Sequence, residues 1–215
     1  MQTQLHKGLK MDVATINYYS ENAKDVAERY ESVVSSLSMS FKNAFSPRSK
    51  LIDVGCGSGR DLALLASLGH DCYGVDATPE FVALSQSLHQ ELQGKVIRAT
   101  LPNFTPPFGG EFDGVLCSAV LMHISENELV PSAISIKRCL KKNGRLLYSV
   151  PSKRLDVICD DRDVNGRLFI TDQSDRLQTI FEQLGFNLIS KWNNEDSMGR
   201  DSVEWLSVLM ELKNA

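Results

Sequence analysis

The stretch Leu51–Asp61, LIDVGCGSGRD, sets the organisation of the chain. Its apolar run leads into three glycines at alternate positions, Gly55, Gly57 and Gly59, and then into a helical sequence that continues to Leu68. This order predicts a strand, a tight turn and a helix. Because glycine lacks a Cβ, the turn can adopt positive φ and let a ligand lie on the backbone, and the helix adds free N–H groups and a positive dipole end. The stretch therefore predicts a site for a carboxylate or a phosphate.

The glycine spacing separates two classes of cofactor. The dinucleotide fingerprint is G-x-G-x-x-G, whereas here Asp53 precedes a G-x-G-x-G turn. The pattern resembles motif I of the class I methyltransferases, which use S-adenosylmethionine. In that family the glycine turn carries the methionine part of the cofactor, and the acid at the position of Asp53 helps to hold its ammonium group. The alternative is a tight turn that binds no ligand.

A second acid, Asp76, follows the predicted short strand Cys72–Val75. At this place in a βαβ unit, an acid can accept hydrogen bonds from both hydroxyls of a ribose. The same geometry serves NAD, so Asp76 indicates a nucleoside without identifying it. The alternative is an acid at a helix N-terminus or in an exposed turn.

Two further segments extend the resemblance. Glu111–Cys117 together with Ser118–Ile124 is similar to the family's fourth strand, FDxVxxxxxLxH, and LKKNGRLLYSV at 140–150 is similar to its fifth-strand entry. The fourth strand borders both the cofactor and the substrate in the family. His123 is therefore the candidate general base, since an imidazole titrates near neutral pH. The alternative is a structural histidine that walls the pocket.

One position departs from the family pattern. An acid often follows the third strand, predicted here at Val96–Ala99, and binds the adenine amino group, but this chain has Thr100. Its hydroxyl could supply a weaker contact, so the departure concerns adenine recognition and not cofactor identity. The cofactor-binding residues that the resemblance implies are Tyr19, Asp53, Gly55, Cys56, Gly57, Gly59, Asp76, Ala77, Thr100, Leu101 and Ser118.

The N-terminal part is expected to cover the cofactor. Apolar spacing predicts one amphipathic helix over Ile16–Leu37. Similar helices lie over the cofactor in many small class I methyltransferases, which implies a contact from Tyr18 or Tyr19, with core packing as the alternative. We expect residues 1–46 to form a helical cap and residues 47–215 the S-adenosylmethionine-binding methyltransferase domain, within one compact unit.

The substrate residues are expected in two polar segments. Ser152–Thr171 predicts a lid or substrate loop, and its Gly166–Phe169 resembles a family segment that lines the substrate site. Arg167 is thereby implied to bind a substrate carboxylate or phosphate, with a surface acid as the alternative partner. The loop 193–204, which contains Arg200, is expected at the pocket mouth. The aspartates of the first segment match no metal-ligand spacing, so no metal is expected.

These elements predict a fold. Phe186–Trp192 and Trp205–Leu212 should form an antiparallel hairpin, because their linker has no helix signal and parallel strands need long crossovers. The fold class is α/β, a seven-stranded, mostly parallel, doubly wound sheet with this antiparallel C-terminal hairpin. Ligands of such sheets bind at the carboxyl ends of the strands.

The composition restricts the partners. With 215 residues and a net charge of −4, the chain fits one globular domain and has no excess of Lys and Arg for a long polyanion. Its five cysteines form no C-x-x-C pair and are expected to be reduced. No apolar run approaches the roughly 20 residues of a membrane helix, and the N-terminus lacks a signal-like apolar core. We expect a cytoplasmic protein.

The sequence thus predicts an S-adenosylmethionine-dependent methyltransferase that acts on an N, O or S atom of a small molecule, as a monomer or homodimer. A tRNA- or protein-directed enzyme is one alternative, with basic residues available only at 137–142 and 152–154. A non-catalytic S-adenosylmethionine-binding module is another, favoured by the missing acid at Thr100. An NAD-dependent oxidoreductase is disfavoured by the glycine spacing.

Overall fold

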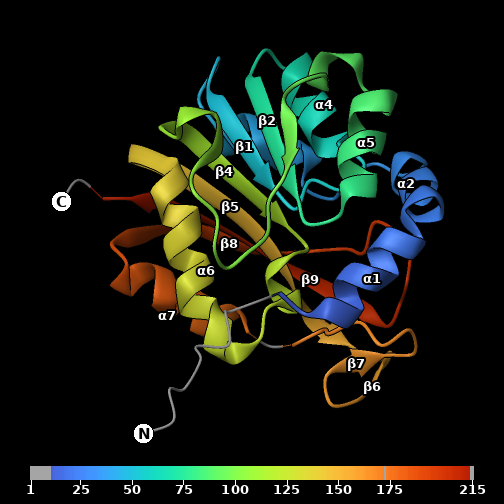
Figure 1. Cartoon of the computed structure of the whole chain (residues 1–215). Coiled ribbons are helices and arrows are strands. Elements are labelled where there is room, and N and C mark those ends of the chain that lie inside the picture. Colours follow the sequence, from blue (N-terminus) through green and yellow to red (C-terminus); the bar gives the residue numbers. More distant parts are fainter. Residues whose placement is uncertain (1–10, 172, 214–215) are drawn as a thin grey trace, which may run out of the picture.

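The fold is a seven-stranded sheet with helices on both faces (Figure 1). A computed structural model describes residues 11–171 and 173–213 of the chain. The strand order is β3-β2-β1-β4-β5-β9-β8, in which the first five run parallel and β9 is antiparallel to both of its neighbours. The strands are β1 (Lys50–Val54), β2 (Asp71–Asp76), β3 (Val96–Arg98), β4 (Phe112–Ser118), β5 (Leu140–Arg154), β8 (Phe186–Asn194) and β9 (Val203–Leu212). The predicted fold class and C-terminal hairpin are confirmed.

Alternating apolar residues of the strands build a core on each face of the sheet. Consecutive side chains of a strand point to opposite faces. In β1, Leu51 joins the core that contains Leu62, whereas Ile52 joins the core that contains Ile136 and Phe181. One face is thus covered by α4 (Arg60–Ser67) and α5 (Pro79–Leu88), and the other by α6 (Glu126–Cys139) and α7 (Ser174–Gln183) (Figure 1).

The strand, turn and helix predicted from the glycine-rich stretch are present. β1 ends at Val54, the glycine turn follows, and α4 begins at Arg60. Gly55 has φ +83°, and a Cβ built there would lie 2.3 Å from Cγ2 of Val120, in the loop after β4. Any larger residue at this position would therefore push the two loops apart.

The N-terminal segment forms two helices, so the prediction of one helix to Leu37 is wrong. α1 (Val13–Glu21) and α2 (Ala23–Glu31) are separated at Asn22, whose backbone leaves the helical region and whose side-chain amide donates to the Tyr18 carbonyl at 2.8 Å. Asparagine side chains compete with the backbone for such hydrogen bonds. The kink lets α2 pack on α5 around Phe81. A division of the chain at residue 46 stays a prediction.

The region after α6 also differs from the prediction, because the sequence pattern predicts a helix over Ser125–Lys142 and a strand over Arg145–Pro151. α6 ends at Cys139 and not at Lys142, because Leu140 already pairs with Phe112 of β4. β5 then extends beyond Pro151 to Arg154 by pairing with β9. The segment predicted as a lid contains a small hairpin, β6 (Val157–Cys159) and β7 (Arg162–Asp163), which lies beside α1 (Figure 1). The short elements are η1 (Ser38–Ser40), α3 (Phe41–Ala44), η2 (Gln90–Leu92), η3 (Pro107–Gly109) and η4 (Leu121–His123).

None of the helices within 11–171 and 173–213 combines the length and apolar character needed to cross a bilayer.

Candidate functional site

A cavity of about 580 Å³ lies at the carboxyl ends of the parallel strands, in the size range of small-molecule sites. Gly59, one of the predicted site residues, is outside its lining. A Cβ there would lie 2.9 Å from Leu92 Cδ1, so this glycine lets the start of α4 pack closely against Leu92. The other predicted residues all line the cavity, namely Tyr19, Asp53, Gly55, Cys56, Gly57, Asp76, Ala77, Thr100, Leu101, Ser118, His123, Arg167 and Arg200.

The cavity has two chemically different ends. We call the part lined by Asp53, 55–57, 76–77 and 99–101 the glycine-turn end. The part lined by other segments we call the arginine end; its residues are His123, Arg154, Arg167, Phe169, Arg200 and Trp205.

Asp53 presents an unpartnered carboxylate oxygen at the glycine-turn end. Its side chain is buried, and Oδ1 has no hydrogen-bond partner within the described part of the chain. Burial raises the pKa of this carboxyl well above its usual range, and the neighbouring charges of Asp61 and Asp76 raise it further. A buried carboxylate in this position would be stabilised by a cationic ligand.

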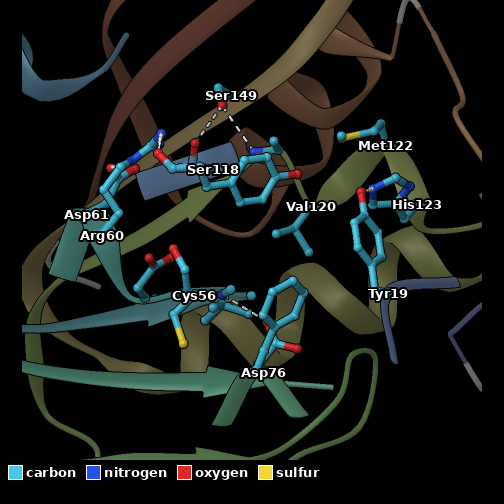
Figure 2. A pocket seen from close by; sticks show the side chains of 18 of the residues that line it. Tyr19, Cys56, Arg60, Asp61, Asp76, Ser118, Val120, Met122, His123 and Ser149 are labelled. Atoms are coloured by element: carbon cyan, nitrogen blue, oxygen red, sulfur yellow. Dashed lines mark hydrogen bonds and ion pairs between the residues drawn. The ribbon is translucent and has the colours of Figure 1, made fainter. Parts of the chain in front are cut away.

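Asp76 is held in one orientation at the end of β2. Its Oδ2 accepts a hydrogen bond from Gly57 N at 3.0 Å, and its Oδ1 accepts from the backbone N and the hydroxyl of Thr78, each at 2.9 Å (Figure 2). Burial raises the pKa of Asp76, although these hydrogen bonds oppose the shift. A carboxylate has about four acceptor positions, so Asp76 can still accept hydrogen bonds from ligand hydroxyls.

The remaining residues of the glycine-turn end offer backbone and apolar surface. Gly57 has φ +55°, and a Cβ built there would meet no atom within 4 Å, so its backbone is open to the cavity. The Thr100 hydroxyl donates to the Leu101 carbonyl at 3.0 Å and lies 3.7 Å from the Met11 sulfur. This hydroxyl is thus engaged locally, and Met11 and Leu101 add apolar surface to the lining of the cavity.

His123 is buried at the arginine end and contacts α1. Its Nδ1 bonds to the Leu168 carbonyl, and its Nε2 lies 3.3 Å from the Tyr19 hydroxyl (Figure 2). Because a carbonyl can only accept, Nδ1 carries the proton and Nε2 accepts from Tyr19. Burial, followed by the charges of Arg167 and Arg154, lowers the pKa of His123 to about 4. The imidazole is therefore neutral near pH 7.

Both arginines that were predicted to contact substrate already have acidic partners. Arg167 pairs with Asp163 at 2.6 Å and donates to the Tyr19 hydroxyl at 3.2 Å. Arg200 pairs with Asp196 at 2.7 Å. The loop after β8 therefore reaches the cavity, as predicted, and each pair joins residues four positions apart and so fixes the shape of its own segment at the cavity wall.

Sequence reasoning missed several lining residues. Arg154 lies at the end of β5, with its guanidinium carbon 3.5 Å from the centroid of the Phe169 ring. The length of β5 was the missing signal, since the predicted strand stopped at Pro151. Ser149 was also missed: its hydroxyl accepts from Ala119 N at 3.1 Å and lies 3.2 Å from the Ser118 hydroxyl (Figure 2). Met122, Trp205, Asp61 and Ser35 also belong to this group.

The helix α1 is tied to the hairpin segment beside the cavity. Arg162 donates through both terminal nitrogens to Asp12, at 2.7 and 3.1 Å, and Leu168 N donates to the Thr15 hydroxyl at 2.9 Å. We call these two contacts the α1 latch. It closes one side of the cavity with residues about 150 positions apart in sequence.

Comparison with known proteins agrees with this geometry. Residues 52–148 match the family model described as "Methyltransferase domain". The mitochondrial ubiquinone biosynthesis O-methyltransferase of Schizosaccharomyces pombe is 32% identical over 119 residues, which cover 53% of this chain and 42% of that protein. The matched segments span between 42% and 62% of the curated relatives' lengths.

Solved structures share the fold at lower sequence identity. Burkholderia thailandensis 1,6-didemethyltoxoflavin-N1-methyltransferase, solved with 1,6-didemethyltoxoflavin and S-adenosylhomocysteine, aligns with TM-score 0.71 and 18% identity over 94% of this chain and 88% of that one. Magnesium protoporphyrin IX methyltransferase of Synechocystis PCC 6803, with bound S-adenosylhomocysteine, aligns with TM-score 0.69 and 16% identity over 92% and 97%. With this fold and the glycine turn, the matched residues 52–148 form a methyltransferase domain of the class I, S-adenosylmethionine-dependent family.

Proposed function

We propose that this chain transfers the methyl group of S-adenosylmethionine to an O, N or S atom of a small molecule. The observation that carries the proposal is the buried, unpartnered Oδ1 of Asp53 beside the open backbone of Gly57. An ammonium group would satisfy that oxygen, and Asp76 is placed to accept hydrogen bonds from ribose hydroxyls.

The charge of the glycine-turn end favours this cofactor over a dinucleotide. The charges of Asp61 and Asp76 raise the pKa of the Asp53 carboxyl, and the charge of Arg60, which pairs with Asp61, opposes this shift. S-adenosylmethionine carries an ammonium and a sulfonium, which these acids attract. The pyrophosphate of NAD would be repelled by the same carboxylates.

Bound S-adenosylmethionine supplies a methyl group on a good leaving group, so the protein has to align the acceptor and exclude water. We propose that His123 contributes to both tasks indirectly. Its neutral Nε2 accepts a hydrogen bond from the Tyr19 hydroxyl and thereby holds α1 against the cavity. Its lowered pKa makes it a weak base. An acceptor that reacts as an anion, an amine or a thiolate fits such a site.

A small acceptor suits the distribution of positive charge better than RNA or protein does. Three of the basic residues at 137–142 and 152–154 are engaged elsewhere: Lys137 donates to the Leu184 carbonyl, Lys141 pairs with Asp113, and Lys153 pairs with Glu204. Phosphate backbones are bound by clusters of available Lys and Arg. The names of similar proteins point the same way, since one refers to ubiquinone biosynthesis and another to 1,6-didemethyltoxoflavin.

Calorimetry with S-adenosylmethionine, S-adenosylhomocysteine and NAD tests the proposal. We expect binding of both sulfur compounds and none of NAD. Asp53→Asn, which keeps the shape and removes the charge, should weaken S-adenosylmethionine binding. Affinity should also fall as pH is lowered, because the Asp53 carboxyl, whose pKa is raised, must be ionised to hold an ammonium group. Unchanged affinity in Asp53→Asn would refute this assignment.

A further inference from the structure

Three arginines line the arginine end, and each is held by one aspartate in the same way. Arg154, Arg167 and Arg200 all use Nε and Nη2 to bind their partners, Asp156, Asp163 and Asp196. A guanidinium has five N–H donors, so this arrangement leaves its Nη1 side able to bind another group. In Arg167 that side is used, since Nη1 donates to the Tyr19 hydroxyl.

Burial distinguishes Arg154 from Arg200. The Arg154 side chain is 3% exposed and its partner Asp156 is 40% exposed, whereas Arg200 is 39% exposed and Asp196 is 4% exposed. Water screens an exposed charge far more than a buried one. The positive charge of Arg154 is therefore buried while its compensating negative charge is partly in solvent, so the negative charge is screened more and the cavity wall at Arg154 has an excess of positive charge.

The Arg154 guanidinium is also fixed in place. It stacks on the Phe169 ring at 3.5 Å, and its bonds to Asp156 are both 2.7 Å long. Its Nη1 makes no hydrogen bond to the residues that the structure describes, and Arg154 lines the cavity. An anionic oxygen is the partner that best satisfies a charged donor of this kind.

Two neighbouring groups add no net charge beside Arg154. His123 is neutral, and Arg167 is compensated by Asp163, which is as buried as Arg154. We infer that the methyl acceptor carries a carboxylate and that Arg154 binds this carboxylate through its free edge. A carboxylate is planar and matches two parallel N–H groups of a guanidinium. This inference rests on the proposed function.

Binding of simple probes to protein saturated with S-adenosylhomocysteine tests the inference. We would titrate benzoate, benzamide and phenyl phosphate by calorimetry. Benzoate should bind at least tenfold more tightly than benzamide, which has the same shape without the charge. Arg154→Gln should weaken benzoate binding by about 10- to 100-fold, the loss of one or two hydrogen bonds to a charged group. Arg154→Lys keeps the charge but not the planar edge, so its benzoate affinity should lie between that of the unchanged protein and that of Arg154→Gln.

The matched control is Arg145→Gln. Arg145 lies on the same strand and pairs with Glu211, but it does not line the cavity. This variant should bind benzoate like the unchanged protein, and Arg154→Gln should retain its affinity for S-adenosylhomocysteine. Equal binding of benzamide and benzoate, no saturable benzoate binding, tighter binding of phenyl phosphate, or unchanged benzoate affinity in Arg154→Gln would each overturn the inference. If the unchanged protein failed to bind S-adenosylhomocysteine, that result would instead refute the proposed function.

Discussion

The two ends of the cavity are built in different ways. The glycine-turn end uses Asp53 and residues 55–57, 76–77 and 99–101, which lie at or just after the carboxyl ends of the neighbouring strands β1, β2 and β3; backbone N–H groups of Gly57 and Thr78 donate to Asp76 there. The arginine end brings together α1, η4, the end of β5, the hairpin segment and the loop before β9. Contiguous residues make the first end, and tertiary packing makes the second. We therefore expect substitutions at the first to act mainly on the cofactor and substitutions at the second to act on the acceptor and on stability.

The two ends also differ in charge. Carboxylates dominate the glycine-turn end, and at least one of them, Asp53, has an unsatisfied oxygen. Arginines line the other end, and their charges contribute to keeping His123 neutral. A positively charged ligand at the glycine-turn end and a negatively charged ligand at the arginine end would complement the two surfaces.

The largest effect on cofactor binding is expected from Asp76→Ala. This change removes the proposed buried acceptor for a ribose hydroxyl together with the support of the Gly57 backbone. We expect the Kd for S-adenosylhomocysteine to rise about 100-fold, or about 3 kcal/mol, from the loss of a hydrogen bond to a charged group and of this support. Asp71→Ala is the control, because Asp71 begins the same strand and pairs with Lys95 at the surface. Equal effects of the two changes in calorimetry would contradict the assignment.

A smaller effect of the same kind is expected from Gly57→Ala. The new Cβ would enter the cavity where the cofactor is proposed to lie, and affinity for S-adenosylhomocysteine should fall about 30-fold, or about 2 kcal/mol. Gly94→Ala is a close control, since Gly94 also has positive φ and an open Cβ position but lies outside the cavity lining. Both changes should cost about 1–2 kcal/mol of stability, because alanine is strained in this conformation. Only Gly57→Ala should weaken binding.

Sequence patterns predicted the fold and the glycine-turn end because both depend on local features. Alternating apolar residues and glycine positions fix strands and turns within short windows. The errors lie where a tertiary contact decided the outcome. Asn22 interrupts a pattern that is otherwise helical, and pairing with β4 and β9 turned the residues around Leu140 and Arg154 into strand.

The arginine end was predicted only in part for the same reason. Arg167 and Arg200 were found through their segments, but nothing in the sequence near Arg154 indicates that its side chain is buried against Phe169. That burial depends on β5 continuing past Pro151 and on the hairpin segment folding back. The exposure of each side chain decides how strongly water screens its charge, and exposure is a property of the tertiary structure.

The pH dependence of stability isolates the arginine end. Folding lowers the pKa of His123 from its ordinary value to about 4, so the unfolded chain binds a proton that the folded chain does not between about pH 6.5 and pH 4. His123 therefore contributes stability that is present above pH 6.5 and is lost as pH falls through this window. His123→Asn keeps a donor for Leu168 and removes the titration. Between pH 7 and 4.5, the free energy of unfolding should fall by about 2 kcal/mol more in the unchanged protein than in this variant.

Denaturant titrations at the two pH values measure this difference. The other acids and bases titrate equally in both proteins, so their contributions cancel in the comparison. An equal pH dependence of the two proteins would mean that His123 is accessible to protons in the folded state. It would also weaken the proposal that its neutral Nε2 positions Tyr19.

The smallest effect is expected at the α1 latch. Asp12 and Arg162 are partly exposed, so their pair should contribute only about 0.5–1 kcal/mol, and Asp12→Asn and Arg162→Gln should each destabilise by about this amount. The double variant should be no less stable than either single one, because both changes break the same pair. Amide hydrogen exchange in α1 should become faster in all three proteins, since α1 is held to the hairpin segment by this pair and by Thr15. If exchange instead rose equally in β1 beside the glycine turn, the two ends of the cavity would open as one unit, and the contrast between a locally fixed end and a tertiary one would fail.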